Sequence, residues 1–352
     1  MPGPAARPAS DPLVTAVIIF LDAEPFLAEA IESVLAQTLT AWELVLVDDG
    51  STDGSTRIAR DYAARDPARI RYLDHPGHAN LGMSASRNIG AAAGTAPFIA
   101  HLDADDIWLP DRLAAFVATA QAFPEAAMVY APTLYWFSWA AGRPGAVPLP
   151  GNDYVGALGL PTRQLLPAPA ALREFLLSRG GSLPCTCSLL IRRDAYDAVG
   201  GFEQAFRTLY EDQVFLSKIA ARFPVVVMDE VHCYYRQHPG SCCAQAVQSG
   251  DYDPNDYHAP RADYLRWLRD HLAAIGLADP VIDAAIAEQL RPYEHPFLVP
   301  VKVAWRRTRR AIKRRLKAAV PVALRRALRH AQHTATGRWH AWRESGLAET
   351  RR

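Results

Sequence analysis

The stretch WELVLVDDGSTDGS, residues 42–55, joins an apolar run to two carboxylates, a turn-rich loop and the start of a helical pattern. A continuous apolar run with β-branched residues is typical of a strand that is covered on both faces. The Gly, Ser and Thr residues after Asp48 and Asp49 favour a loop that leads into a helix over 55–65. The stretch therefore predicts one strand, loop and helix unit of a parallel sheet.

The same alternation of apolar runs and helical spacing extends in both directions from this stretch. It predicts strands at 13–20, 70–74, 96–103, 127–139 and 187–193, and helices at 25–37, 84–94, 113–123, 209–223 and 260–290. The Pro- and Gly-rich segment 141–170 is expected to be a surface loop, with a lid over an acceptor site as the alternative. Strands that alternate with helices indicate an α/β fold with a mostly parallel central sheet flanked by helices.

Three carboxylates follow the predicted strand FIAHLD, because the chain continues as Asp103-Ala-Asp105-Asp106. Like charges this close disfavour joint ionisation, so a shared cation or covering water is needed. Two carboxylates two residues apart suit Mg²⁺ or Mn²⁺, which usually complete their coordination with phosphate oxygens. The simpler alternative is that such aspartates cap the helix that follows.

Charge is distributed unevenly along the 352 residues, although the formal net charge is +1. Residues 295–352 carry sixteen Lys and Arg against two Glu, so the rest of the chain is acidic. A basic amphipathic tail over 301–352 can lie on an anionic membrane surface or pack on the acidic body, whereas nucleic acid binding is not expected. Residues 1–12 are expected to form a disordered leader without an export signal, which predicts a cytoplasmic protein.

The five cysteines, an odd number, match no common zinc spacing and are expected to be buried or idle thiols. No apolar run is long enough to suggest a transmembrane helix.

The order of the motifs is more specific than any one of them. The order over residues 13–240 is an apolar strand, then VDDGSTDGS, then NLGMSASRNIGAAAGTAPFIAHLDADD, then YEDQ and finally YYRQHPGS. This succession resembles the family 2 inverting glycosyltransferases with the GT-A fold, the nucleotide-diphospho-sugar transferase fold. The resemblance implies a catalytic domain at 13–245 and a helical extension at 246–300 before the basic tail.

The resemblance also implies where the nucleotide-sugar donor binds. Asp48 and Asp49 match positions that contact the base and ribose, and Asp103 matches a position near the ribose. Arg87 and Asn88, in SASRN, match a motif that lies near the diphosphate or braces the acidic loops.

A metal site and a catalytic base follow from the same resemblance. Asp105, with Asp103 and His238, would hold Mn²⁺ or Mg²⁺, and Arg236 could meet the diphosphate. Asp212 would be the general base, and Glu211 would orient the acceptor. Without the other motifs, the simpler interpretation of Glu211 and Asp212 would be exposed charges at the start of a helix, where the helix dipole favours carboxylates.

The chain departs from the family pattern after its first strand, where IIFLDAEPFL replaces the usual P-x-Y-N. It also lacks Q-x-x-R-W after YEDQ, the signature of processive synthases, so transfer of a single sugar is expected. The resemblance implies a UDP-linked donor and a glycan or lipid-linked acceptor. The alternative is a catalytically silent, glycosyltransferase-like scaffold anchored by the basic tail. For either function, contact of the tail with an anionic leaflet would place the protein at the inner face of the cell membrane. A nucleotidyl-transferring pyrophosphorylase would need a Gly-rich loop after the first strand, which FLDAEPFL does not contain.

Overall fold

The computed structural model describes residues 11–141, 143, 145–252 and 258–295. By its internal contacts the chain divides into Met1–Arg291 and Pro292–Arg352. The second unit is described only over residues 292–295, so the predicted tail at 301–352 and most of the predicted leader lie outside the described residues.

Three parallel strands form the buried centre of the first unit: β1 (Val14–Phe20), β2 (Trp42–Asp48) and β4 (Phe98–Asp103). Every residue of β1 and β2 is buried, as expected for apolar runs covered on both faces. The register pairs Phe20 with Asp48 and Ile19 with Asp103. The acidic ends of β2 and β4 therefore lie at the same edge of the sheet, one on each side of β1.

Eight strands make up this sheet, in the order β3-β2-β1-β4-β10-β6-β11-β9. β10 runs antiparallel to both β4 and β6, and β9 runs antiparallel to β11, while the other neighbours are parallel. The predicted mostly parallel sheet is thus observed, with β10 inserted in the opposite direction. The strands not yet located are β3 (Ile70–Asp74), β6 (Met128–Tyr130), β9 (Leu165–Leu166), β10 (Leu189–Arg192) and β11 (Val225–Val227).

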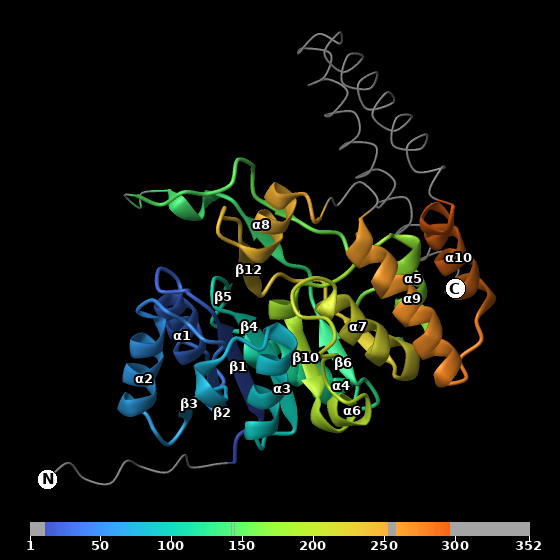
Figure 1. Ribbon diagram of the computed structural model, residues 1–352. Coiled ribbons are helices and arrows are strands. Elements are labelled where there is room, and N and C mark those ends of the chain that lie inside the picture. The colour runs from blue at the N-terminus through green and yellow to red at the C-terminus, as the bar shows by residue number, and fades with distance from the viewer. Residues whose placement is uncertain (1–10, 142, 144, 253–257, 296–352) are drawn as a thin grey trace, which may run out of the picture. The chain divides into compact units, whose positions relative to one another are not determined.

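Helices cover both faces of the sheet (Figure 1). Val17, Ile19 and their neighbours on β2 pack against α3, whereas Ile18 and Phe20 face a larger core that includes α1 and α4. This alternation along β1 follows from the two-residue period of a strand. The helices of this region are α1 (Leu27–Leu35), α2 (Ser55–Arg65), α3 (Met83–Ala93), α4 (Arg112–Ala122), α5 (Ala170–Leu177), α6 (Arg193–Ala198) and α7 (Glu211–Arg222).

A second sheet was not expected from the sequence. It contains four strands in the order β5-β12-β7-β8, and its members are β5 (Ile107–Trp108), β7 (Leu134–Trp136), β8 (Tyr154–Val155) and β12 (Cys233–Arg236). The prediction of one strand over 127–139 is therefore wrong, because its first part joins the large sheet as β6 and its last part joins the small sheet as β7. Pairing of β12 with β5 brings the YYRQHPGS segment next to the Asp105 loop.

The described chain ends in three helices, α8 (Cys242–Ser249), α9 (Ala259–Ala274) and α10 (Pro280–Glu294). The predicted helix at 260–290 is two helices, separated by residues 275–279. α9 contacts α7 through the Tyr264 hydroxyl, which lies 2.8 Å from Ser217 Oγ. Short 3-10 turns occur at Pro76–His78, Ser138–Ala140 and Thr186–Ser188. None of the helices among these residues is both long and apolar enough to cross a bilayer.

Candidate active site

Arg87 links two of the predicted acidic motifs. Its buried guanidinium donates from Nη2 to Asp103 Oδ1 at 2.8 Å and from Nη1 to Glu211 Oε1 at 2.9 Å. Asp103 ends β4 and Glu211 begins α7, 108 positions later in the chain. One guanidinium with a fixed fork of donors can satisfy both carboxylates, so Arg87 holds these two elements together.

Glu211 and Asp212 form the first turn of α7, directly after Tyr210 in the left-handed conformation (φ 67°). Burial and the charge of Asp212 raise the pKa of Glu211 to about 7, despite the opposing effect of Arg87. Burial also raises the pKa of Asp212, whose Oδ1 accepts a 2.7 Å hydrogen bond from the Gln213 N–H. A carboxylate with a raised pKa is a better proton acceptor than one in water, provided that it stays ionised.

Asp105 and His238 lie together, although 133 positions separate them in the chain. His238 Nε2 is 2.9 Å from Asp105 Oδ2, and its ring packs against Phe26 with centroids 4.6 Å apart. The Asp105 side chain retains 24% exposure, so its carboxylate remains accessible.

Asp106 points away from this surface into the protein. Its Oδ1 accepts the Arg236 backbone N–H at 2.9 Å, and burial with the nearby charge of Asp105 raises its pKa well above the usual range. Asp106 therefore holds β12 in place through its hydrogen bond to the Arg236 backbone.

Arg236 is fully buried and surrounded by rings. Its guanidinium lies about 5 Å from the ring centroids of Phe26, Trp136 and Trp139, donates from Nε to the Asp105 carbonyl at 2.7 Å and from Nη2 to Glu29 at 2.8 Å. These contacts favour a bracing role for Arg236 over the predicted contact with a diphosphate.

The carboxylates of Asp48 and Asp49 accept hydrogen bonds from nearby loop and helix residues. Asp48 Oδ1 accepts from the Ser51 N–H at 2.7 Å, and its Oδ2 accepts from the Thr56 hydroxyl at 2.5 Å. Asp49 accepts from the backbone N–H groups of Leu81 and Gly82 at 2.8 to 3.1 Å. Both carboxylates therefore shape the loop after β2, which is the part of the site predicted to meet the nucleotide.

Asn88 braces a distant loop. Its side-chain amide donates to the Phe202 carbonyl at 2.8 Å, and its oxygen accepts from the Phe202 N–H and the Tyr196 hydroxyl, both at 2.8 Å. Of the two roles open to the SASRN motif, these contacts support bracing for Asn88.

Two groups beside the site were not singled out from the sequence. Glu29 accepts hydrogen bonds from both Arg236 and Arg143. A carboxylate in the first turn of an amphipathic helix gives no indication of these partners in the sequence.

Cys242 begins α8, and its thiol lies 3.7 Å from the Thr208 carbonyl. Desolvation, together with the charges of Glu211 and Asp103, raises the pKa of this thiol. The position of Cys242 directly after the HPGS segment was the only available signal.

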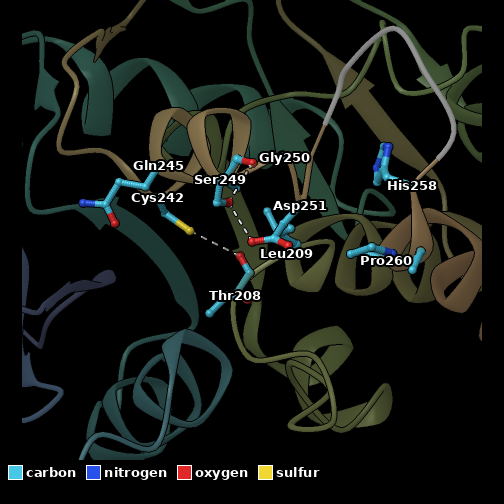
Figure 2. A pocket seen from close by; sticks show the side chains of 11 residues that line it. Thr208, Leu209, Cys242, Gln245, Ser249, Gly250, Asp251, His258 and Pro260 are labelled. Carbon is cyan, nitrogen blue, oxygen red and sulfur yellow. Dashed lines mark hydrogen bonds between the residues drawn. The ribbon is translucent and has the colours of Figure 1, made fainter.

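A cavity adjoins these residues. Thr208 and Leu209, which precede the first turn of α7, face α8 and residues 258–260 across it (Figure 2).

The donor set fits a hard divalent cation that is shared with a ligand. Among the residues that the structure describes, no group of three or more His, Cys, Asp and Glu side chains could enclose a metal ion. Asp105 and His238 nonetheless offer a carboxylate and an imidazole at one accessible point, and Asp103 lies two positions before Asp105 in the chain. Mg²⁺ and Mn²⁺ commonly take one or two protein ligands and complete their coordination with phosphate oxygens and water.

Comparison with known proteins indicates the family of this chain. A family model for glycosyl transferase family 2 matches residues 15–200. EpsJ of Bacillus subtilis (strain 168), an uncharacterized glycosyltransferase by name, is 45% identical over 95 residues, which are 27% of this chain and 26% of EpsJ. The match thus spans about a quarter of that relative.

Solved structures show the same fold at low sequence identity. S. aureus TarS 1-349 in complex with UDP-GlcNAc matches with a TM-score of 0.57 and 19% identity over 80% of this chain and 72% of that one. Mannosyltransferase PcManGT from Pyrobaculum calidifontis, in complex with GDP-Man and Mn²⁺, matches with a TM-score of 0.54 and 18% identity over 96% and 82%. The sheet is therefore that of the GT-A fold, and the chain belongs to glycosyl transferase family 2.

Proposed function

We propose that this protein transfers a single sugar from a UDP-linked nucleotide sugar to an acceptor hydroxyl in glycan or polysaccharide biosynthesis, with inversion and with a divalent metal ion. The observation that carries the proposal is the meeting of Asp103, Arg87 and Glu211 at one edge of the sheet, with Asp212 beside them. Membership of family 2 supports the reaction class, and the nucleotide-sugar complexes of the structural neighbours support the donor class.

In this mechanism Asp212 is the general base. Its carboxylate takes the proton of the acceptor hydroxyl while that oxygen forms a bond to the anomeric carbon, and the bond from this carbon to the diphosphate oxygen breaks. Glu211, held by Arg87, orients the acceptor side of the site. The raised pKa of Asp212 strengthens it as a base.

Asp105, His238 and Asp103 would hold the Mn²⁺ or Mg²⁺ ion, which stabilises the negative charge on the departing diphosphate when bound. The complex of PcManGT with Mn²⁺ supports this choice of ion. Asp48 and Asp49 support the loop that would contact the base and ribose.

The test of the proposal is release of nucleoside diphosphate from UDP-glucose, UDP-galactose, UDP-GlcNAc and GDP-mannose, with Mn²⁺ or with EDTA. Asp212→Asn should lower the transfer rate about 10²- to 10⁴-fold, because the variant has no base, while calorimetry with UDP and Mn²⁺ shows retained affinity. Asp194→Asn, which alters an exposed aspartate in the first turn of α6, is the matched control and should keep the full rate.

The alternative is a catalytically silent scaffold. It predicts no metal-dependent affinity for UDP and no diphosphate release from any donor. A fully active Asp212→Asn variant would instead remove Asp212 from the mechanism and leave the activity standing.

We also propose contact of residues 301–330 with an anionic membrane surface at the cytoplasmic face, where a lipid-linked acceptor would be reached. Twelve Lys and Arg and no acidic residue lie between Lys302 and Arg329, and each charge near such a surface contributes about 1 kcal/mol. Deletion of residues 301–352 should abolish sedimentation with vesicles that contain phosphatidylserine. Equal partitioning of both forms would favour the alternative, in which the tail packs on the acidic body.

A further inference from the structure

The cavity beside α7 has a volume of about 700 Å³, within the usual range of ligand sites of about 300 to 1,000 Å³. Three segments form its walls: residues 208–209 before α7, the length of α8, and residues 258–260 at the start of α9 (Figure 2). Its lining residues are Thr208, Leu209, Cys242, Gln245, Ala246, Ser249, Gly250, Asp251, His258, Ala259 and Pro260.

The cavity borders the segment that leads into Glu211 and Asp212 of the candidate active site. Thr208 and Leu209 lie only two to four residues before Glu211 and Asp212. The Cys242 thiol, 3.7 Å from the Thr208 carbonyl, closes the wall between α8 and this segment. Because residues 208–209 lead directly into the first turn of α7, a molecule in the cavity lies next to the segment that carries the proposed base.

The lining chemistry suits hydroxyl groups. Hydroxyl, amide, imidazole and carboxylate side chains alternate with small apolar ones, as needed for a sugar ring with polar edges and C–H faces. The hydrogen bond from Ser249 Oγ to Asp251 Oδ2, 2.6 Å long, presents an acidic acceptor at the wall (Figure 2).

Anionic ligands are disfavoured here. Among the described residues that line the cavity, none is Lys or Arg. The nearest basic residues in the chain are engaged elsewhere, since Arg207 donates to the Asn80 carbonyl and Arg261 donates to the Arg179 carbonyl and to Gln289. A phosphate in the cavity would lie near the Asp251 carboxylate, with no Lys or Arg among the described lining residues to balance its charge.

We infer that this cavity binds the acceptor through an uncharged sugar unit, which presents its hydroxyl to Asp212. The inference rests on the proposed function and adds the class of acceptor and the place where it binds. A sugar phosphate or a bare lipid phosphate is excluded as the group inside the cavity.

The experiment uses the full chain with Mn²⁺ and a nucleotide sugar that it hydrolyses. Neutral p-nitrophenyl glycosides of glucose, galactose, mannose and N-acetylglucosamine are compared with the corresponding sugar 1-phosphates as acceptors. At least one neutral glycoside should accelerate diphosphate release above hydrolysis, and the 1-phosphates should not. A response to the 1-phosphates alone, or to no member of the panel, would overturn the inference.

Adjacent positions on α8 provide matched variants. Ala246 lines the cavity, whereas Val247 is 50% exposed and does not line it. Ala246→Trp should raise KM for the accepted glycoside about 10- to 100-fold by filling the cavity, and Val247→Trp should leave it unchanged. Gln245→Trp, at an exposed position in the cavity wall, replaces Ala246→Trp if that variant does not fold.

The outcomes separate the two proposals. Absence of diphosphate release from every donor by the unmodified chain would refute the proposed function, and the acceptor site with it. Hydrolysis of a donor, combined with an unchanged glycoside KM in folded Ala246→Trp or Gln245→Trp, would refute only the acceptor site.

Discussion

Arg87 illustrates how a single residue organises this site. A buried guanidinium is costly unless its charge is balanced, and here Asp103 and Glu211 supply the balance from two distant elements. Burial also affects the acidic partners, because burial and the charge of Asp212 raise the pKa of Glu211 to about 7. The charge of this cluster therefore changes close to neutral pH.

The pH dependence of transfer should reflect this titration. Above about pH 7 Glu211 is ionised and balances Arg87, and below it the neutral carboxyl no longer does so. We expect kcat/KM to fall as the pH falls through about 7. In Glu211→Gln the fall of kcat/KM should occur at lower pH, because the titration that remains is that of Asp212. An acidic limb at the same pH in both proteins would show that Glu211 is not the group observed.

At the scale of elements, β12 connects the Asp105 loop, the proposed metal site, to the rest of the fold. It pairs with β5 on one side and β7 on the other, and then delivers His238 to Asp105. Arg236, the last residue of β12, fixes this geometry through the Asp105 carbonyl and Glu29. The small sheet thus positions Asp105 and His238, the proposed metal ligands, although neither residue belongs to its strands.

Arg236→Lys should weaken the response to Mn²⁺ without removing the ligands. One ammonium cannot reproduce the planar fork that bonds two partners between three aromatic rings, and loss of such a supporting contact typically costs about 10- to 100-fold in metal affinity. The Mn²⁺ concentration for half-maximal activity is the measurement. Arg143→Lys is the control, since Arg143 also pairs with Glu29 but lies at the surface, where ion pairs contribute about 0 to 1 kcal/mol. Equal effects of both variants would contradict the bracing role.

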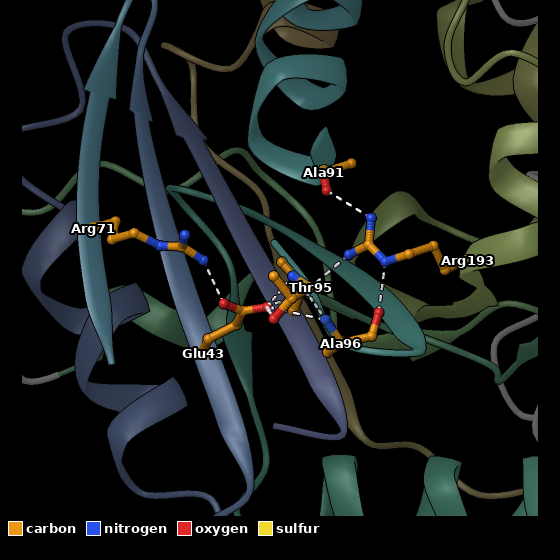
Figure 3. A network of polar contacts seen from close by, with 7 residues as sticks. Glu43, Arg71, Ala91, Thr95, Ala96 and Arg193 are labelled. Carbon is orange, nitrogen blue, oxygen red and sulfur yellow. Dashed lines mark hydrogen bonds and ion pairs between the residues drawn. The ribbon is translucent and has the colours of Figure 1, made fainter. Parts of the chain in front are cut away.

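At the scale of the whole described unit, a buried polar network fastens the opposite end of the sheet (Figure 3). Glu43 of β2 accepts from the Thr15 hydroxyl at 2.8 Å, from the Thr95 N–H at 2.5 Å and from the Ala96 N–H at 3.1 Å. Arg71 of β3 donates to the other carboxylate oxygen. One side chain thus joins β1, β2, β3 and the segment that enters β4.

Arg193 extends this network to α6. Its Nη2 donates to Thr15 Oγ1 at 3.0 Å, and its Nε and Nη1 donate to the carbonyls of Ala96 and Ala91 at 2.6 and 2.8 Å. The network therefore connects the parallel half of the sheet to β10 and α6, on the side remote from the acidic strand ends.

Glu43→Gln should lower the free energy of unfolding by about 1 to 3 kcal/mol at pH 7, because it breaks buried hydrogen bonds to a charged acceptor. Burial raises the pKa of Glu43, but the Thr95, Thr15 and Ala96 donors outweigh burial and leave the pKa below its usual value of 4.5. The stabilisation is therefore present above about pH 4.5 and is lost as the pH falls through the lower folded-state pKa. Urea unfolding at pH 7 and at pH 4 measures it, and a constant difference between the two proteins would contradict this assignment.

The sequence by itself determined the parallel core and the acidic ends of its strands. Apolar runs of seven residues leave little choice about where β1 and β2 lie, and the Asp residues that end β2 and β4 must then meet at one edge. The order of the motifs along the chain was sufficient to predict the family.

Only the tertiary structure decided which partners each charged side chain takes. Arg236 and Asp106 turned inward, Asn88 bound a loop 114 positions away, and the small sheet formed from strands of two to four residues that carry almost no periodic signal. Local sequence patterns indicate burial and backbone conformation, because both depend mainly on residues that are close in the sequence. Ion pairs such as Arg87 with Glu211 depend on contacts between residues far apart in the chain, and these are fixed only when the sheets and helices pack.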